Sequence, residues 1–156
     1  MKKFQFYLGK LLSYKDQNLE NEMMILGGLT RQLSEEMDKQ LDLEDQQDKC
    51  QKNYERDMAA SITPTACQVY IHYMSFLKEQ IKIVEKRIDE ITEKIDIQIE
   101  VVKNLKLETR SLEIVKENRY DEYKKEIVKE TEKQILPSVF RRTQSLDIDL
   151  QVHVRT

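Results

Sequence analysis

The chain has few of the residues that interrupt regular structure or build a compact interior. Its 156 residues include three glycines, two prolines and no tryptophan, and 35% of them are charged. Helix-breaking residues are almost absent between Thr30 and Ser61 and between Thr65 and Leu136. Because a compact domain needs short elements separated by frequent turns, we expect one elongated domain of long helices. Such a domain has little interior in which to enclose a substrate.

Other features that would indicate particular classes of protein are missing too. No apolar run approaches the roughly 20 residues that span a bilayer, and no apolar signal-peptide core follows the first three residues. We therefore expect a cytoplasmic protein. The net charge is −3 with both signs interspersed, which leaves no broad basic face for nucleic acid. In the cytoplasm Cys50 and Cys67 are expected to be reduced thiols that serve as small packing residues.

The sequence also lacks a recognisable catalytic or metal-binding arrangement. His72 and His153 have no cysteine or carboxylate at ligand spacing, and neither Gly9 nor Gly27-Gly28 belongs to a phosphate-binding loop. Paired acids such as Glu35-Glu36 are typical of a solvated helix surface. The sequence therefore predicts a protein that is not an enzyme and that holds no metal and no cofactor.

What the chain does contain is two long ladders of mostly apolar residues at coiled-coil spacing. The ladder of the second half alternates steps of four and three through Leu77, Ile81, Val84, Ile88, Ile91, Ile95, Gln98, Val102, Leu105, Thr109 and Leu112. The ladder of the first half runs through Leu8, Leu12, Leu19, Leu26, Leu33, Gln40, Gln47 and Tyr54, with Leu29, Leu43 and Cys50 between them. Helices with this repeat bury the ladder as a seam against a partner helix. The predicted fold is all-α, a long antiparallel two-helix coiled-coil hairpin.

The turn of this hairpin is predicted near Ile62. Thr63 can cap the free amides of a helix, and Pro64 suits a first turn because the N–H that it lacks would have no partner there. We expect a first arm over residues 4–59, a turn over 60–63 and a second arm over 64–136 that ends before Pro137. Residues 137–156 then form a tail in which residues 146–155 alternate apolar and polar side chains, as in a strand. We favour a flexible tail, with an extended segment that adds to a partner's sheet as the alternative.

Charge and surplus apolar surface both follow the predicted arms. The acid-rich stretch from Glu35 to Asp48 is expected to face Lys78, Lys82, Lys86 and Arg87 across the hairpin, in flank ion pairs that fix the register. A second stripe, Phe76, Gln80, Ile83 and Arg87, lies one place before successive seam residues. Aromatic and apolar residues also crowd the opening segment, where they either close the end of the coil or dock a partner. Since a two-helix seam cannot bury all of this surface, the arms either recruit another helix or bind a partner.

The chain resembles the flagellar FliJ family over roughly residues 1–136. The resemblance lies in the aromatic and basic opening from Lys3 to Lys15, a heptad arm, a short turn, Tyr73-Met74-Ser75-Phe76-Leu77, a longer second arm and the late Tyr120-Asp121-Glu122. It implies a non-enzymatic component of the flagellar type III export apparatus, shaped like the stalk subunit of rotary ATPases. Such a stalk docks into the hexameric export ATPase, promotes its assembly and activity, and contacts the cytoplasmic domain of the export gate protein and the export chaperones. The implied location is cytoplasmic, at the inner face of the cell membrane and peripheral to it through these partners only.

The resemblance also assigns two sets of contact residues. The set that would dock into the ATPase ring is Phe4, Phe6, Leu8, Leu11, Leu12, Arg119, Tyr120, Glu122 and Tyr123. The set that would contact the export gate is Tyr54, Tyr73, Phe76, Gln80, Ile83 and Arg87.

Two alternatives remain at this point. The chain could be the stalk or a chaperone of a virulence-type secretion system, or a generic coiled-coil scaffold that dimerises through its exposed stripe. Self-association separates the last alternative from the others, because a stalk is expected to be monomeric when alone.

Overall fold

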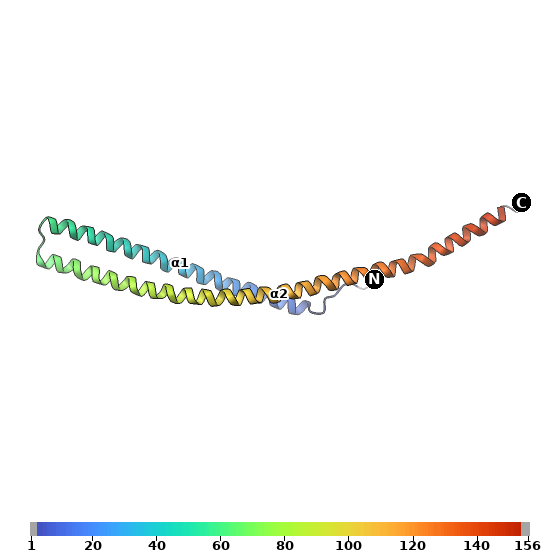
Figure 1. Ribbon diagram of the computed structural model, residues 1–156, viewed down its shortest axis with the longest axis horizontal. Helices are drawn as coiled ribbons and strands as arrows, with labels where there is room; N and C mark the ends of the chain where they lie inside the picture. The colour runs from blue at the N-terminus through green and yellow to red at the C-terminus, as the bar shows by residue number, and fades with distance from the viewer. Residues whose placement is uncertain (1–2, 154–156) are drawn as a thin grey trace. The chain divides into compact units, whose positions relative to one another are not determined.

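The computed structural model describes residues 3–153, with side chains described for residues 3–142, and it consists of two helices (Figure 1). Helix α1 spans Gly9–Ala59 and helix α2 spans Pro64–His153. Within the described range there is no strand. The predicted all-α helical hairpin is confirmed. The chain divides into two compact units: a hairpin unit of Lys15–Leu107, and a terminal unit of Met1–Tyr14 with Glu108–Thr156.

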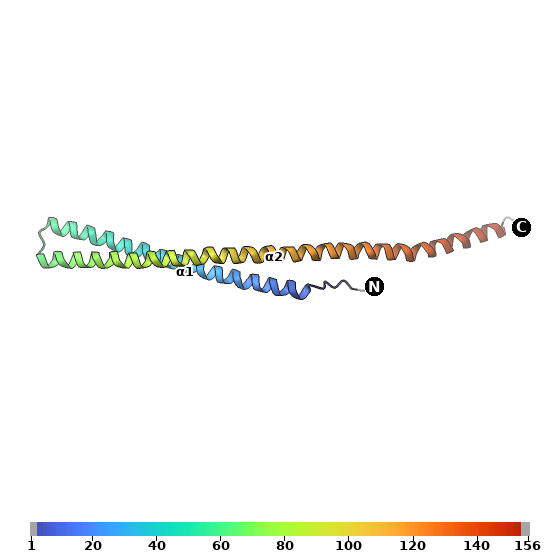
Figure 2. The same ribbon diagram turned by 60° about the horizontal axis from the view of Figure 1, so that its bottom comes forward.

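In the hairpin unit the two helices lie side by side and run in opposite directions (Figures 1 and 2). They pack along the predicted seam, in which Leu77 is only 1% exposed and Cys50, Val84 and Val102 are also buried. The seam residues of α2 between these positions are half-buried, in unbroken steps of four and three. Most of the stability of such long helices comes from this packing rather than from helix propensity.

A polar pair interrupts the apolar seam of the hairpin unit. The Gln98 side chain donates a hydrogen bond from Nε2 to the Glu22 carbonyl oxygen (3.0 Å) and another to the Glu22 carboxylate (2.5 Å). Both side chains are half-buried. A polar pair in a coiled-coil seam costs stability but is satisfied in only one alignment, so this one specifies the register of the two arms.

The turn combines a helix end and a helix start. Ser61 has a φ of 68°, the left-handed conformation in which many helices end, and its amide donates to the Met58 carbonyl (3.3 Å). At the start of α2 the Thr63 hydroxyl accepts a hydrogen bond from the Ala66 amide (3.2 Å). This bond satisfies one of the amides that have no partner within the helix.

The expected start of the first arm at residue 4 is wrong. Residues 3–8 are not helical, and α1 begins at Gly9. This segment supplies the acceptors of the first hydrogen bonds of the helix. The Gly9 amide donates to the Phe6 carbonyl (3.0 Å) and the Leu12 amide to the Leu8 carbonyl (2.9 Å). The segment departs from the helix because Phe4 packs instead against aromatic residues of α2.

The expected end of the second arm before Pro137 is also wrong, because α2 continues through Pro137 to His153. Proline removes one backbone hydrogen bond from a helix and crowds the preceding turn. Residues 131–142 are exposed, so water can bond the carbonyl that is freed, and the Ser138 hydroxyl donates to the Ile135 carbonyl (2.7 Å). The strand-like alternation of residues 146–155 is helical backbone as far as His153, and the end of that stretch lies outside the described residues.

None of the described helices is both long and apolar enough to cross a membrane.

Candidate docking surfaces

An aromatic cluster joins the opening segment to α2 in the terminal unit. The Phe4 ring lies edge-on to Tyr120, with centroids 5.1 Å apart, and 5.5 Å from Tyr123. Tyr120 and Tyr123 stack at 6.3 Å, and the Lys124 ammonium lies 4.4 Å from the Tyr120 centroid. Each such ring pair contributes about 0.5–1.5 kcal/mol beyond the area that it buries. The cluster therefore holds a non-helical segment in place.

The nine residues expected to dock into the ATPase ring all belong to the terminal unit. The structure brings Phe4, Tyr120 and Tyr123 together, whereas Leu12 is buried and so is not available to a partner. Leu11, one position earlier, is exposed. Of the remaining members, Phe6 packs on Tyr7 (5.5 Å), Leu8 is half-buried, and Arg119 forms an exposed ion pair with Glu122 (3.0 Å).

The sequence interpretation missed one exposed apolar surface of the terminal unit. Ile135, Leu136, Val139 and Phe140 are all exposed on α2. Val139 and Phe140 lie in the stretch that the sequence analysis assigns to the tail, and Ile135 and Leu136 in the last turn of the predicted second arm, so the four were not seen as one surface. The steps of four from Ile135 to Val139 and from Leu136 to Phe140, and of three from Leu136 to Val139, indicate a common helix face once the helix is continued past Pro137.

The residues expected to contact the export gate form a stripe on α2 of the hairpin unit. We call Tyr73, Phe76, Gln80, Ile83 and Arg87 the gate stripe. Tyr73 is 43% and Phe76 56% exposed, and their rings stack at 6.5 Å. Ile83 and Arg87 are exposed and Gln80 is half-buried. These exposed rings present apolar surface that the partner helix does not cover.

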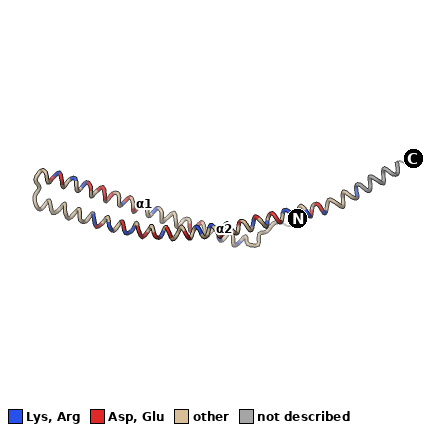
Figure 3. The backbone as a smooth tube through the Cα atoms, viewed as in Figure 1, with Lys and Arg blue, Asp and Glu red and all other residues tan. Residues whose placement is uncertain are grey.

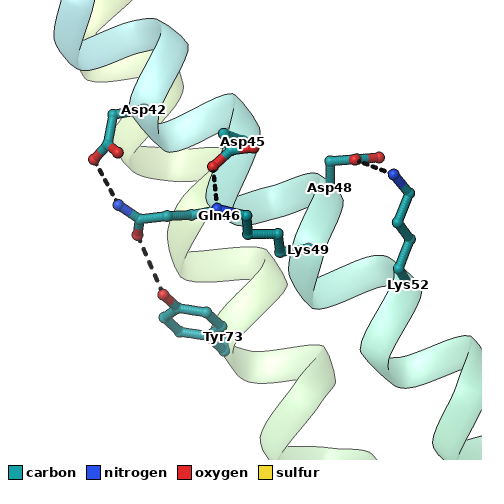
Figure 4. A network of polar contacts seen from close by, with 7 residues as sticks. All are labelled: Asp42, Asp45, Gln46, Asp48, Lys49, Lys52 and Tyr73. Carbon is teal, nitrogen blue, oxygen red and sulfur yellow. Dashed lines mark hydrogen bonds and ion pairs between the residues drawn. The ribbon is translucent and has the colours of Figure 1, made fainter.

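Polar contacts hold the first ring of the gate stripe (Figure 4). The Tyr73 hydroxyl donates to the Gln46 side-chain oxygen (3.3 Å), and the Gln46 amide nitrogen donates to Asp42 (2.7 Å). At the other end of the stripe the Arg87 guanidinium lies 4.0 Å from the Glu36 carboxylate. The stripe is therefore anchored to α1 at both ends, which lowers the conformational entropy that a partner must remove on binding.

Tyr54 is placed apart from the gate stripe. It is a half-buried seam residue whose hydroxyl lies 3.4 Å from the Cys67 sulfur, and its ring packs 5.6 Å from Tyr70. The hydrogen bond with Cys67, followed by the charge interaction with that thiol, raises the pKa of Tyr54. The contacts of Tyr54 are those of a residue that closes the seam near the turn.

A second tyrosine near the turn is paired with a carboxylate. The Tyr70 hydroxyl donates to Asp57 (2.5 Å). This hydrogen bond raises the pKa of Tyr70, and it lowers the pKa of Asp57, with a smaller contribution from Arg56. Both shifts favour the pair as neutral phenol and ionised carboxylate.

The acid-rich stretch of α1 is neutralised mainly within its own helix. Seven acids lie between Glu35 and Asp48 (Figure 3). Lys49 pairs with Asp45 (2.6 Å) and Lys52 with Asp48 (2.7 Å), as Figure 4 shows. In the described hairpin, the predicted set of cross-helix ion pairs reduces to Arg87 with Glu36. Lysines one turn away on the same helix reach the acids with less loss of side-chain freedom than those of the opposite arm.

No group of three or more His, Cys, Asp and Glu side chains within the described residues is arranged to hold a metal ion. The described residues present two exposed contact surfaces: the aromatic cluster of the terminal unit and the gate stripe of the hairpin unit.

Comparison with known proteins identifies a family that the chain matches. The model of the family described as "Flagellar FliJ protein" matches residues 4–135. No curated protein and no solved structure matches the chain. The family match covers both candidate docking surfaces and stops just before Pro137.

Proposed function

The chain belongs to the FliJ family of flagellar export components, and on this premise we propose that it is a stalk that docks into the hexameric flagellar export ATPase. In this role it promotes the assembly and activity of the ring, and links it to the export gate and the export chaperones. It works in the cytoplasm, at the inner face of the membrane and held there by its partners. The chain performs no chemistry itself, since hydrolysis of ATP belongs to the ring.

The observation that carries this proposal is the aromatic cluster of the terminal unit. Phe4 fixes the opening segment against Tyr120 and Tyr123, while Tyr7, Leu11 and Tyr14 remain exposed. A fixed segment with exposed apolar side chains can bind without first being ordered. If it binds the assembled ring better than free subunits, it shifts the equilibrium towards the ring by mass action.

The gate stripe supports a second contact made by the same chain. It lies in the hairpin unit, so a partner bound there uses none of the residues of the aromatic cluster. Exposed aromatic rings with an arginine at one end form the kind of surface in which binding energy concentrates. We assign this stripe to the cytoplasmic domain of the export gate protein.

The experiment that tests the first contact is a titration of the purified export ATPase with this protein, measuring the ATPase rate and the oligomeric state. We expect the wild type to raise both. Leu11→Asp should abolish the effect, because the substitution places a charge on an exposed apolar side chain without touching the aromatic cluster. Phe76→Ala, at an exposed apolar site of the hairpin unit, is the control and should stimulate normally. No stimulation by folded wild type in excess would reject the stalk function.

The same two variants test the second contact, with the test variant and the control exchanged. Binding to the cytoplasmic domain of the gate protein, measured by calorimetry, should weaken about tenfold or more with Phe76→Ala and remain unchanged with Leu11→Asp. Equal losses with both variants would show that the two surfaces do not have separate partners.

A further inference from the structure

A groove runs along α2 in the hairpin unit. Its volume is about 480 Å³, and it is lined by Leu26, Ile99, Val102, Lys103, Lys106 and Leu107. Leu107 is 61% and Ile99 44% exposed, whereas Val102 is buried. The stretch from Ile99 to Lys106 is about 11 Å long, which is two turns of helix. The groove therefore has an apolar floor of a length that two turns of another helix would cover.

The groove and the gate stripe lie on opposite sides of the hairpin. The hydrogen bond between Tyr73 and Gln46 joins two residues that each precede a seam position. Residues that precede the seam therefore share one side, and residues that follow it share the other. Ile99, Lys103 and Lys106 each follow a seam position, so a partner that lies in the groove leaves the gate stripe accessible.

On the side of the groove, α1 carries a flexible and a small residue. Met23 and Gly27 each follow a seam position and are exposed, and Gly27 comes directly after Leu26, which lines the groove. A Cβ added at Gly27 would meet no atom within 4 Å. Packing within the chain therefore gives no reason for a glycine inside this helix, where glycine is unfavourable. Close approach of a second backbone gives such a reason, and methionine adapts its shape to an irregular partner.

Two lysines of α2 select the charge of whatever occupies the groove. Lys103 and Lys106 both line it, are exposed and lie one turn apart. The ion pair of Lys103 is with Glu100 of the same helix, at 3.6 Å and with both side chains 65% exposed. Such a pair contributes little and is readily exchanged. A helix in the groove pairs with both lysines when it carries two carboxylates three or four residues apart along the facing edge.

We propose that this groove binds one amphipathic helix of a partner protein, with an apolar stripe against Ile99 and Leu107 and carboxylates that face the two lysines. The inference rests on the proposed function, in which the contact with the export chaperones has no surface of its own. Since the terminal unit is assigned to the ring and the gate stripe to the gate, we assign the groove to a helix of an export chaperone. A chaperone bound there stays attached while the gate protein binds the opposite side of the same hairpin.

The first test is a calorimetric titration of the full chain with purified export chaperones of the same flagellar system. We expect a chaperone to bind the wild type, and its dissociation constant to rise at least about tenfold when Lys103→Glu and Lys106→Glu are combined. The matched control combines Lys78→Glu and Lys82→Glu, which change the charge equally at exposed residues of α2 away from the groove. It should bind as the wild type does. Equal weakening by both pairs would reduce the contact to net charge and overturn the proposal.

The second test uses the two adjacent glycines of α1. Gly27 follows a seam position and Gly28 precedes one, so side chains added there project on opposite sides of the hairpin, and at neither would a Cβ meet an atom within 4 Å. Gly27→Gln and Gly28→Gln should both raise the midpoint of urea unfolding, because glutamine favours a helix more than glycine does. Only Gly27→Gln should weaken chaperone binding, by at least about tenfold. Because the variant is more stable, unfolding would not explain that loss. Normal binding by Gly27→Gln would overturn docking in the groove.

Failure of this inference is distinguishable from failure of the proposed function. The variant with Lys103→Glu and Lys106→Glu should stimulate the export ATPase as the wild type does, because its aromatic cluster is unchanged. Normal stimulation by a wild type that binds no chaperone would overturn the groove contact alone. Sedimentation equilibrium should show a monomer, and a dimer weakened by the same two substitutions would give the groove to a second copy and overturn the proposal. A wild type that neither stimulates the ATPase nor binds a chaperone would reject the proposed function, and this inference with it.

Discussion

The hairpin unit and the terminal unit use the same α2 helix in different ways. In the hairpin unit α2 has a helical partner, and a seam residue is buried or half-buried every three or four positions. In the terminal unit residues 3–8 are not helical, Phe4 packs on the rings of Tyr120 and Tyr123 in addition to the buried seam residues Leu12 and Thr109, and residues 128–142 are all exposed. A mostly aliphatic seam between two packed helices stabilises a structure by itself, whereas a stretch of helix without a packed partner helix leaves its apolar side chains exposed. The comparison indicates that stability resides mainly in the hairpin unit and that the terminal unit leaves more of the apolar surface of α2 exposed.

The largest effect is expected when the seam of the hairpin unit is broken. Leu77→Ala removes the most buried side chain of the hairpin and should lower the free energy of unfolding by about 2–5 kcal/mol. Phe76→Ala, the exposed neighbour, should change it by no more than about 0.5 kcal/mol. Urea unfolding followed by circular dichroism measures both. Similar losses for the two would mean that the seam is not the main source of stability.

Variants of the Gln98–Glu22 pair test whether this pair lowers the stability of the seam while fixing the register of the two arms. Gln98→Leu alone leaves the half-buried Glu22 carboxylate without its donor, and should cost about 1–3 kcal/mol. Combining it with Glu22→Leu should recover that loss and exceed the wild type, because an apolar pair suits the seam better. We expect the double variant to be more stable but less uniform in register, visible as duplicated amide signals in NMR spectra. A single set of signals would show that other contacts specify the register.

A smaller and local effect is expected from the aromatic cluster. Phe4→Ala removes two ring contacts worth about 0.5–1.5 kcal/mol each. Hydrogen exchange should accelerate at the amides of Gly9 and Leu12, which bond to the opening segment, while the Leu77 amide exchanges at its original rate. If the Leu77 amide accelerated equally, the two units would unfold together and the contrast between them would be lost.

The smallest effect concerns pH at the turn of the hairpin. The Tyr70 hydrogen bond holds the pKa of Asp57 below its ordinary value of 3.8, so its stabilising contribution is complete above that pH and is lost as the pH falls through the lowered pKa. The pKa of Tyr70 is raised above 10.0 by the same bond, so that contribution is lost as the pH rises through the raised value. NMR titration of the Asp57 carboxyl should show a midpoint below 3.8 that moves upward in Tyr70→Phe. An unchanged midpoint would mean that the phenol does not stabilise the carboxylate.

The seam illustrates what a local pattern can reveal. Steps of three and four predicted which residues of both arms face each other, because only one stripe of a helix can be buried in a two-helix coil. Phe76, Gln80, Ile83 and Arg87 followed from the same rule, since residues one place before the seam lie at its edge, whereas Tyr73 was added by the family resemblance. Tyr54 shows the limit of that rule: its spacing placed it in the seam, and the resemblance assigned it to a surface, but its contacts with Cys67 and Tyr70 are those of a seam residue.

The sequence by itself determined the helical content, the seam and the family, because these depend on residue spacing within each segment. Only the tertiary structure decided where α1 begins, that α2 passes Pro137, and which polar side chains meet across the seam. Phe4 leaves the helical path because its ring finds Tyr120 and Tyr123, more than a hundred positions away in the chain. Contacts over such distances leave no periodic trace in the sequence, since each depends on the free energy of packing in three dimensions rather than on the preference of a local segment.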